Sequence, residues 1–561
     1  MTTPLSNEPG PASRPRSIGN GGGRRVHAGP TSHEGMGVRR AGLAGLGRLV
    51  ALAALGSLWL ACATGAAGPS AAGPGAQPLS AGGGGAPPED PRLRPPPFAS
   101  TTPAPPPLST PEEREDSRTV ARRLIIDAAW RAVRDRHYDP TLGGVDWTTI
   151  RARYEPLALG APDEAAFYRT LNQMLGELGQ SHMQISGPGA ADDEADGDRP
   201  AASDGTGTPS AATTPATRAT PATSAAPTTI EGLGDPGLTV RSIEGRAVVT
   251  AVRAGSSAAR QGIRPGFVVL EIGGRNLAAP GAASPRPLRP VEERFRLRRA
   301  ATSWLQGPVG TRVTLKVLDN GDRPLERVLE RDRLDGPVRQ IGHLPPLHPE
   351  TRVSVIDGVG VLAFNLFLID PTLGDVKRAI DRFRALRVKG VILDLRGNPG
   401  GIGAMAIPVA AELVPGPTTL GTVHFRTFKQ TFTAQPSLGR TPFTGPLVIL
   451  TDEGTASTSE ILAGGLQEAG RARVVGDTTL GAVLPSVVEA LPGGAVIQVV
   501  VADFQTPKGV LLEGRGVQPD ARVVETRAAF AGGHDPVLEA ALDTLRGRTT
   551  RAPRSVKPPT R

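Results

Sequence analysis

The sequence is poor in several residue types, and each shortage limits the structures or sites that the chain can form. It holds a single cysteine, Cys62, so a disulfide framework or a cysteine-based zinc site cannot form within the chain. Aromatic residues make up only 4% of the sequence, so we expect its cores to be aliphatic. Long apolar runs are also scarce, because residues 41–61 form the only one.

Lysine is nearly absent, and the positive charge comes from arginine. Six of the 63 basic residues are lysine, which leaves 57 arginines and a net charge of +9. The arginines are scattered along the chain rather than gathered in one stripe, so we expect no nucleic-acid partner. The sequence has no His-Glu-x-x-His motif and no acidic cluster of ligand spacing, so we expect no metal and no other cofactor.

The length of 561 residues indicates several domains, and Gly- and Pro-rich stretches mark the divisions. The composition predicts a mixed α/β (α+β) multidomain protein. We expect a signal segment at 1–62, a disordered tether at 63–112, a helical subdomain at 113–186, a low-complexity linker at 187–230, a β domain at 235–335, an α/β core at 345–546 and a basic disordered tail at 547–561.

The N-terminal apolar run is typical of a secretory signal. It follows Arg39-Arg40 and ends at Cys62, and a start at Met36 would give it ordinary length. The lone cysteine at this place resembles a bacterial lipoprotein signal, which implies that Cys62 is lipidated. An uncleaved transmembrane anchor and ordinary secretion remain alternatives. All three place the folded part outside the cytoplasm, in the cell envelope.

The three folded segments differ in their patterns. Apolar residues three and four apart predict helices in 113–186. Residues 235–332 predict strands with one short helix at 256–262. Residues 352–530 alternate strands and helices, which predicts a central sheet flanked by helices, with its site where the strands end.

Two turns carry the candidate chemistry. Residues 394–401 (DLRGNPGG) follow one predicted strand, and residues 451–460 (TDEGTASTSE) follow another. Ser457 stands at a predicted helix N-terminus, where backbone amides stabilise a developing oxyanion. The same spacing, Ser457-x-x-Glu460, is also that of a helix-capping box, so the pattern alone leaves both interpretations open.

Residues 254–277 (AGSSAARQGIRPGFVVLEIGGRNL) resemble part of a PDZ domain, which implies a PDZ-like β-sandwich. The resemblance implies a peptide-binding loop whose amides hold a terminal carboxylate beside an open sheet edge. The loop would comprise Gly237, Leu238, Thr239 and Val240. A Pro- and Arg-rich insert at 278–299 departs from the PDZ pattern.

Residues 394–401, 454–482 and 506–520 together resemble the C-terminal processing (tail-specific) serine peptidase family. The resemblance implies that Ser457 is the nucleophile. In the Ser–Lys branch of that family the base is a lysine 25 residues later, but here that position is Ala482. The supporting glutamine of the same branch is replaced by Ser486.

The tricorn-like branch of that family uses a Ser–His–Glu site instead. Its motif appears here as residues 175–182 (LGELGQSH), which implies that His182 is the base. Glu513 would orient the imidazole, either directly or through Ser181. The implied oxyanion donors are the N–H of Thr458 and that of Gly400 or Gly401. With an imidazole pKa near 6.5, we expect activity to rise between about pH 6 and 7.5.

The resemblance implies a serine-type peptidase, a hydrolase that cleaves unfolded or C-terminally recognised polypeptides in the cell envelope. Its partners would be polypeptides with free C-termini and, through the lipid anchor, a membrane; homo-oligomerisation stays open. Two alternatives remain. One is an inactive PDZ-containing peptide-binding protein, and the other is a hydrophobic-ligand carrier built on the same core.

Overall fold

The computed structural model describes residues 111–188, 232–277, 287–334, 336, 339 and 347–547. The predicted signal segment, Cys62, the tether, most of the linker and nearly all of the tail lie outside these residues. Within the described ranges, no helix is both long and apolar enough to cross a bilayer.

The first described segment is helical, as predicted. Its elements are α2 (Pro111–Arg136), η1 (Leu142–Gly144), α3 (Trp147–Leu159), α4 (Glu164–Gly176) and the short strand β1 (Gln184–Ser186). Asp146 caps α3 by accepting from the N–H groups of Thr148 and Thr149. Trp130 of α2 and Trp147 of α3 each donate an indole N–H to the other's carbonyl at 3.1 Å, which fixes the packing of the two helices.

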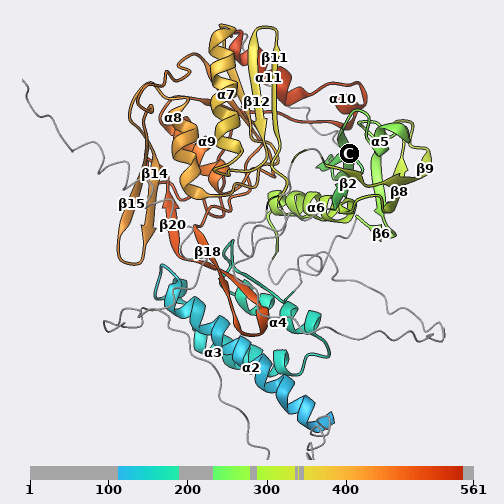
Figure 1. Ribbon diagram of the computed structural model, residues 1–561, viewed down its shortest axis with the longest axis vertical. Coiled ribbons are helices and arrows are strands. Elements are labelled where there is room, and N and C mark those ends of the chain that lie inside the picture. Colours follow the sequence, from blue (N-terminus) through green and yellow to red (C-terminus); the bar gives the residue numbers. More distant parts are fainter. Residues whose placement is uncertain are drawn as a thin grey trace, which may run out of the picture. The chain divides into compact units, whose positions relative to one another are not determined.

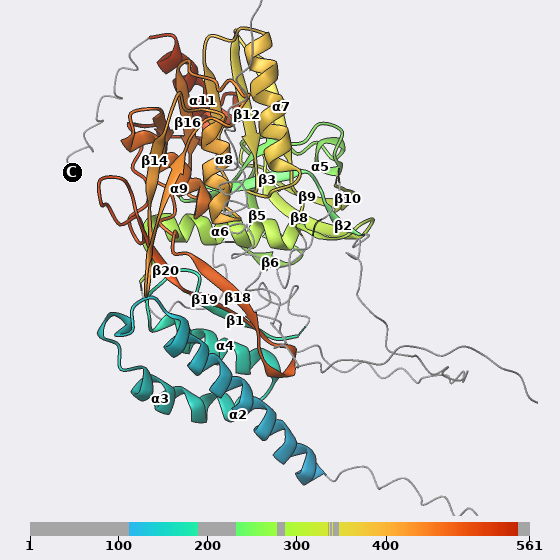
Figure 2. The same cartoon turned by 60° about the vertical axis from the view of Figure 1, so that its left-hand side comes forward.

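The helical segment does not close its own core. β1 pairs with β19 (Val496–Val500), which pairs in turn with β18 (Ser486–Ala490). Ile497, Val499 and Val500 pack into the same apolar cluster as the helices. Figure 2 shows β19 beside the helical segment. The subdomain that the sequence predicts at 113–186 is therefore completed by strands from more than 300 residues later in the chain.

The second segment is an antiparallel sheet with two helices. Its elements are β2 (Leu233–Asp235), β3 (Leu238–Ile243), β4 (Arg246–Val252), α5 (Ser257–Arg260), β5 (Val268–Ile272), β6 (Arg275–Asn276), α6 (Pro290–Leu305), β7 (Gly307–Pro308), β8 (Arg312–Leu318), β9 (Pro324–Glu330) and β10 (Asp332–Arg333). The main sheet has the order β3-β4-β5-β8-β9, with β6 paired to β5, so β3 lies at an edge.

Helix α6 corrects the prediction of one short helix in this segment. It occupies much of the Pro- and Arg-rich insert. Pro290 starts it and two glutamates fill its first turn, both of which favour a helix N-terminus. Val291, Ala301 and Leu305 are buried. The arginines between these sparse apolar residues hide the helical period in the sequence.

The third segment is the predicted α/β core. Its elements are β11 (Thr351–Ile356), β12 (Val359–Phe364), α7 (Thr372–Ala385), β13 (Val391–Asp394), η2 (Gly403–Met405), α8 (Ala406–Ala411), β14 (Thr418–Phe425), β15 (Lys429–Ala434), β16 (Leu447–Thr451), α9 (Thr458–Glu468), β17 (Arg473–Gly476), β18, η3 (Pro492–Gly494), β19, β20 (Ala502–Gln505), β21 (Ala521–Arg522), α10 (Arg527–Ala531) and α11 (Pro536–Leu545).

The central sheet has the order β11-β12-β13-β16-β17-β21, and all neighbours are parallel except β11 and β12. Successive strand residues face opposite sides, so both faces are apolar. Leu393 and Ile449 join the cluster that includes α7, α8 and α9, whereas Ile392 and Val448 join the cluster of α11. Figure 1 shows these helices beside the strands of the core. Helices thus cover both faces, and the strand ends remain for the site.

Some strands of the core leave the central sheet. β14 pairs with β15 and with β20 in a separate antiparallel sheet. The β14–β15 hairpin was not predicted, although its residues alternate in burial along part of both strands. Arg426 in the turn of this hairpin donates to the carbonyls of Arg134 and Asp135 at 3.1 Å, so the hairpin caps the C-terminal end of α2.

Candidate active site

Ser457 lies where the turn after β16 enters α9. Its backbone has φ 53° and ψ −119°, an unusual conformation for a residue with a side chain. Ser457 is the N-cap of α9 and forms the predicted capping box with Glu460, although an ordinary capping serine has extended backbone angles. The turn is held by Asn398, whose carbonyl accepts from Ala456 N–H at 3.1 Å and from Ser459 Oγ at 3.0 Å.

The glycine-rich turn after β13 packs directly on Ser457. A Cβ atom on Gly400 would lie 2.7 Å from Ser457 Cβ and 2.9 Å from Thr458 N, and Gly400 has φ 101°. Glycine is therefore required there both for space and for backbone conformation. The two turns that the sequence singles out are in contact.

Two N–H groups near Ser457 are available as oxyanion donors. Thr458 is the first residue of α9, where an N–H has no partner within the helix. Gly400 N–H is already donated to Asn398 Oδ1 at 2.9 Å. Among the described residues, the N–H of Gly401 makes no hydrogen bond, while its carbonyl accepts from Thr458 Oγ1 at 3.1 Å. Of the two neighbouring glycines, the geometry favours Gly401.

The position of the lysine in the Ser–Lys branch lies beside Ser457. The carbonyl of Ala482 accepts from Ser457 N–H at 2.9 Å. Ser486 lies on β18 and accepts from the side chain of Gln498 at 2.7 Å. The backbone of the turn that carries Ala482 thus contacts Ser457, but the turn has no lysine side chain.

A chain of hydrogen bonds runs from Glu513 to His182. Ser181 Oγ donates to Glu513 Oε2 at 3.0 Å and lies 2.7 Å from His182 Nδ1, and Ser181 N–H donates to Glu513 Oε1 at 2.9 Å. Because the serine proton goes to the carboxylate, His182 Nδ1–H donates to Ser181 Oγ. This tautomer leaves Nε2 with its lone pair free to accept a proton. Of the two routes considered from the sequence, the structure shows the one through Ser181.

A single peptide unit joins this chain to the serine. The Ala482 carbonyl accepts from Ser457 N–H, and Val483 N–H, across the same peptide bond, donates to Glu513 Oε2 at 2.9 Å. Within the described part of the chain, the Ser457 hydroxyl makes no direct hydrogen bond with His182. The structure therefore brings Ser181, His182 and Glu513 into contact and links them to Ser457 through the backbone.

Burial alters the acid–base behaviour of the imidazole. Desolvation lowers the pKa of His182 from 6.5 to about 4. The imidazole is thus neutral, and able to act as a base, throughout the neutral range. The rise in activity expected between about pH 6 and 7.5 assumed a solvated imidazole, and desolvation moves the titration of His182 below that range.

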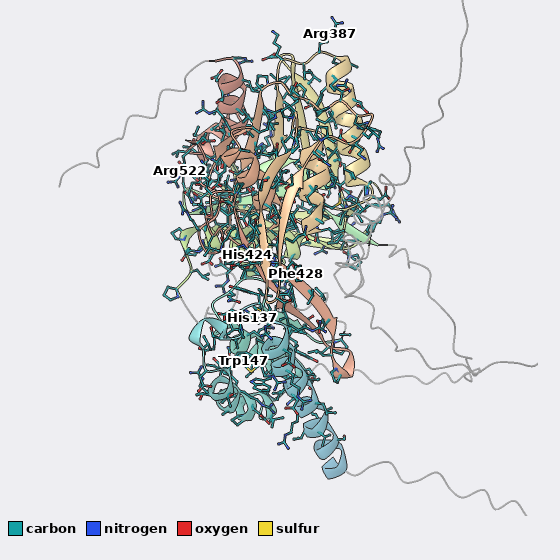
Figure 3. All side chains as sticks on the ribbon, turned by 90° about the vertical axis from the view of Figure 1, so that its left-hand side faces the viewer. His137, Trp147, Arg387, His424, Phe428 and Arg522 are labelled. Carbon is teal, nitrogen blue, oxygen red and sulfur yellow. The ribbon has the colours of Figure 1, made fainter. Side chains whose placement is uncertain are left out.

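His137 is a site residue that sequence reasoning missed. It directly follows α2, where Figure 3 labels it, and it is completely buried. Its Nε2 lies 2.7 Å from Gln180 Oε1. Gln180 directly precedes Ser181 and His182, so His137 supports the loop that carries the imidazole. In the sequence, His137 begins the stretch HYDP (residues 137–140), and this stretch indicates no role for the histidine.

Two arginines of the second segment clamp the loop before Ser457. Arg241 of β3 donates to both oxygens of Glu453 at 3.0 Å, and Arg298 of α6 donates to Asp452 Oδ2 at 2.6 Å. Burial raises the pKa of Asp452, but the charges of Arg298 and Arg241 outweigh burial and hold the pKa below its usual range. The loop is therefore fixed as an ionic cluster.

The predicted peptide-binding loop lies at the start of edge strand β3. Gly237 has φ 81°, and a Cβ there would lie 2.2 Å from Ser256 Cβ, so only glycine fits. Its N–H already donates to Asp235 Oδ1 at 2.7 Å. Leu238, Thr239 and Val240 follow as the first residues of β3. No group of three or more His, Cys, Asp or Glu side chains in the described ranges is placed to hold a metal ion.

Comparison with known proteins identifies the families and the fold that this chain resembles. Residues 358–523 match the model of peptidase family S41, and residues 121–176 match that of the tricorn protease C1 domain. The crystal structure of mature CPAF has a similar fold, with a TM-score of 0.50, 15% sequence identity and coverage of 77% of this chain and 99% of that one.

Two curated relatives align over most of the chain. A carboxyl-terminal-processing protease of Synechocystis sp. is 27% identical over 434 residues, which cover 76% of this chain and 88% of that protein. The chloroplastic carboxyl-terminal-processing peptidase 3 of Arabidopsis thaliana is 27% identical over 428 residues, which cover 74% and 71%. Both turns at Ser457, and Glu513, lie within the matched family region. The chain therefore carries a peptidase family S41 region at residues 358–523 and is a serine-type hydrolase.

Proposed function

We propose that this protein is a C-terminal-processing endopeptidase that cleaves polypeptides through Ser457, His182 and Glu513. The observation that carries the proposal is the hydrogen-bonded chain Glu513–Ser181–His182 beside a turn whose lysine position holds alanine. This chain of hydrogen bonds supplies a histidine base in a protein whose lysine position is occupied by Ala482. The two named relatives, both carboxyl-terminal-processing enzymes, support the substrate class.

The groups present account for each proton in the reaction. Ser457 Oγ attacks the scissile carbonyl carbon while His182 Nε2 accepts the hydroxyl proton. The N–H groups of Thr458 and Gly401 receive the resulting oxyanion. The imidazolium then protonates the leaving amine, and a water molecule releases the acyl group by the same steps in reverse order. Ser181 and Glu513 stabilise the imidazolium from the Nδ1 side.

The contact between Ser457 and His182 has to form when substrate binds. Catalytic hydrogen bonds are often long in enzymes without substrate and shorten in the Michaelis complex. The strained backbone of both residues, with φ 53° at Ser457 and 58° at His182, is consistent with side chains held for a reaction rather than for packing.

Labelling with a fluorophosphonate probe tests the proposed activity. The probe should modify Ser457 in the wild-type protein and nothing in Ser457→Ala, as shown by mass spectrometry of the labelled peptide. An inactive peptide-binding protein would bind peptides without being labelled, which would contradict the proposal. A carrier would instead show a wide apolar cavity around Ser457, whereas backbone from Gly400 and Ala482 contacts the serine here.

We further propose that the PDZ-like second segment selects free C-termini. Strand β3 lies at the edge of its sheet, which leaves one side for an added peptide strand. Because Gly237 N–H is occupied, the carboxylate would be held by the amides at the start of β3, from Leu238 to Val240. Free-acid peptides should be cleaved faster than their C-terminal amides. Equal rates for the two forms would contradict this role.

We also propose that the enzyme is a lipoprotein of the cell envelope, anchored through Cys62. The basic and apolar pattern before the lone cysteine supports this location. Membrane fractionation of Cys62→Ser should move the protein to the soluble fraction or leave an unprocessed precursor. A mature protein that stays on the membrane without Cys62 would show that the anchor is another one.

A further inference from the structure

Glu460 is a buried carboxylate that the reaction above does not use. It is the last residue of the Ser457-x-x-Glu460 pattern, and it has no solvent-exposed surface. A capping glutamate normally reaches back to one N–H at the surface of a helix end. The surroundings of Glu460 differ from that arrangement.

Four donors converge on this carboxylate. Oε1 accepts from Thr479 Oγ1 at 2.5 Å and from Gly481 N–H at 2.7 Å. Oε2 accepts from Ala482 N–H and from Ser457 N–H, both at 3.0 Å. The carboxylate therefore spans the gap between the nucleophile and the turn that stands where the Ser–Lys branch has its base.

All four partners are donors, which specifies the ionised form. A protonated carboxyl group would need an acceptor. Three partners are backbone N–H groups, and the Thr479 hydroxyl already accepts from Val517 N–H at 2.7 Å. Burial raises the pKa of Glu460 to about 7, although each of the four hydrogen bonds lowers it. With that pKa, protonation of Glu460 would remove the charge that these four donors stabilise.

Two charged groups bind the same turn from other elements. Arg289, at the start of α6, donates to the carbonyls of Leu480 and Gly514. Glu513 accepts from Val483 N–H. The turn thus has ionised partners on both sides of the residues that Glu460 holds.

We propose that Glu460 is a positioning residue of the peptidase, whose ionised carboxylate holds Ser457 and the Thr479–Val483 turn in register with Glu513, Ser181 and His182. The proposal rests on the proposed peptidase function. Protonation of Glu460 weakens four hydrogen bonds at once, and the peptide unit between Ala482 and Val483 then loses its fixed place between nucleophile and base.

The proposal assigns the neutral part of the pH profile to Glu460. Labelling of wild-type Ser457 by a fluorophosphonate should rise in two steps, near pH 4 with His182 and near pH 7 with Glu460. Glu460→Gln places an amide NH₂ against N–H donors. It should slow labelling above pH 7 by about 10²-fold, the cost of a small misplacement of reacting groups, and the step near pH 7 should disappear.

Glu468→Gln is the matched control on the same helix. Glu468 also accepts two hydrogen bonds from a neighbouring loop, from Thr506 Oγ1 and Lys508 N–H at 2.8 Å, but it lies about 12 Å further along α9. Its replacement should leave both the labelling rate and the step near pH 7 as in the wild type. A loss of the step in the control would contradict the proposal.

Thr479→Val provides a second variant in case Glu460→Gln folds poorly. It removes one donor that favours the ionised carboxylate of Glu460, so the rise in labelling near pH 7 should move to higher pH. A purely structural threonine would change stability without moving the step. An unchanged midpoint in Thr479→Val, or a wild-type profile in Glu460→Gln, overturns the role of Glu460. Absence of labelling in the wild type would instead overturn the proposed function itself.

Discussion

At the residue scale, the central feature is an imidazole oriented by a serine that lies between it and a glutamate. Ser181 carries the interaction of Glu513 to His182 Nδ1, and burial lowers the pKa of His182 to about 4. In the proposed mechanism, a base with a low pKa is neutral at working pH, and the carboxylate behind it would stabilise the charge that the imidazole gains during the reaction.

The lowered pKa of His182 predicts a specific dependence of stability on pH. Between about pH 6.5 and pH 4, His182 binds a proton in the unfolded chain but not in the folded protein. The free energy of unfolding therefore falls as the pH falls through this window. Between pH 7 and pH 4, the free energy of unfolding should decrease by up to about 3 kcal/mol less in His182→Gln than in the wild type. Urea unfolding at pH 7 and pH 4 measures it, and an equal loss in the wild type and the variant would contradict the burial effect.

Several of the candidate residues could be predicted from the sequence, but their protonation could not. Ser457, His182, Ser181 and Glu513 each stand in a recognisable motif. The pKa of His182 depends on how completely the surrounding chain removes water, which no local pattern encodes. The choice of Gly401 over Gly400 likewise depends on Asn398, whose side chain already accepts the N–H of Gly400.

At the element scale, helix α6 and strand β3 hold the loop that leads to Ser457. Arg298 is 17% exposed and its partner Asp452 is 1% exposed, so the pair is largely removed from water. Arg298 NH2 also lies where a Cβ of Gly397 would be, at 1.8 Å, and so fills space that only glycine leaves. The arginine packs between the two turns as well as binding the carboxylate.

Arg298→Ala should destabilise the protein by about 3–5 kcal/mol, because it leaves a buried carboxylate without this partner. Arg352→Ala is the control, since that arginine is 73% exposed and its partner Glu350 is 49% exposed, and loss of such a surface pair costs at most about 1 kcal/mol. Urea unfolding of both variants measures the difference. Equal destabilisation by the two would show that the α6 contact does not hold the loop.

The elements that sequence reasoning missed have a common cause. The period of α6 is masked by its arginines, two of which, Arg294 and Arg298, bind carboxylates of the α/β core instead of facing solvent. The β14–β15 hairpin lies outside the central sheet, so the strand–helix alternation that predicts the central sheet does not predict the hairpin. Strands such as β13 and β16 were predicted because their residues are buried on both faces and form continuous apolar runs.

At the scale of the whole molecule, the site is assembled from distant parts of the chain. His182 comes from the helical segment and Ser457 and Glu513 from the core, and Ser181 and Glu513 are separated by 332 residues in sequence. The pairing of β1 with β19 places the histidine loop against the core. The sequence contains each part, but the register of this pairing is set only in the folded chain.

This assembly predicts that the helical segment cannot fold alone. Residues 111–188 expressed without the core would expose the apolar surface that Ile497, Val499 and Val500 cover. We expect such a fragment to lack a cooperative thermal transition by circular dichroism. A fragment extended by a linker and residues 484–501, which contain β18 and β19, should regain part of it. Cooperative unfolding of the short fragment would show that the two parts are independent domains.

The most direct test of the central claim is the rate of peptide hydrolysis in His182→Ala beside Ser457→Ala. The two residues act as one unit, so each variant should lose about 10⁴–10⁶-fold in kcat, and Glu513→Gln should lose less. Ala482→Lys in the His182→Ala background should not restore activity, because the supporting glutamine is Ser486 here. A His182→Ala enzyme that keeps wild-type kcat would contradict the assignment of His182 as the base.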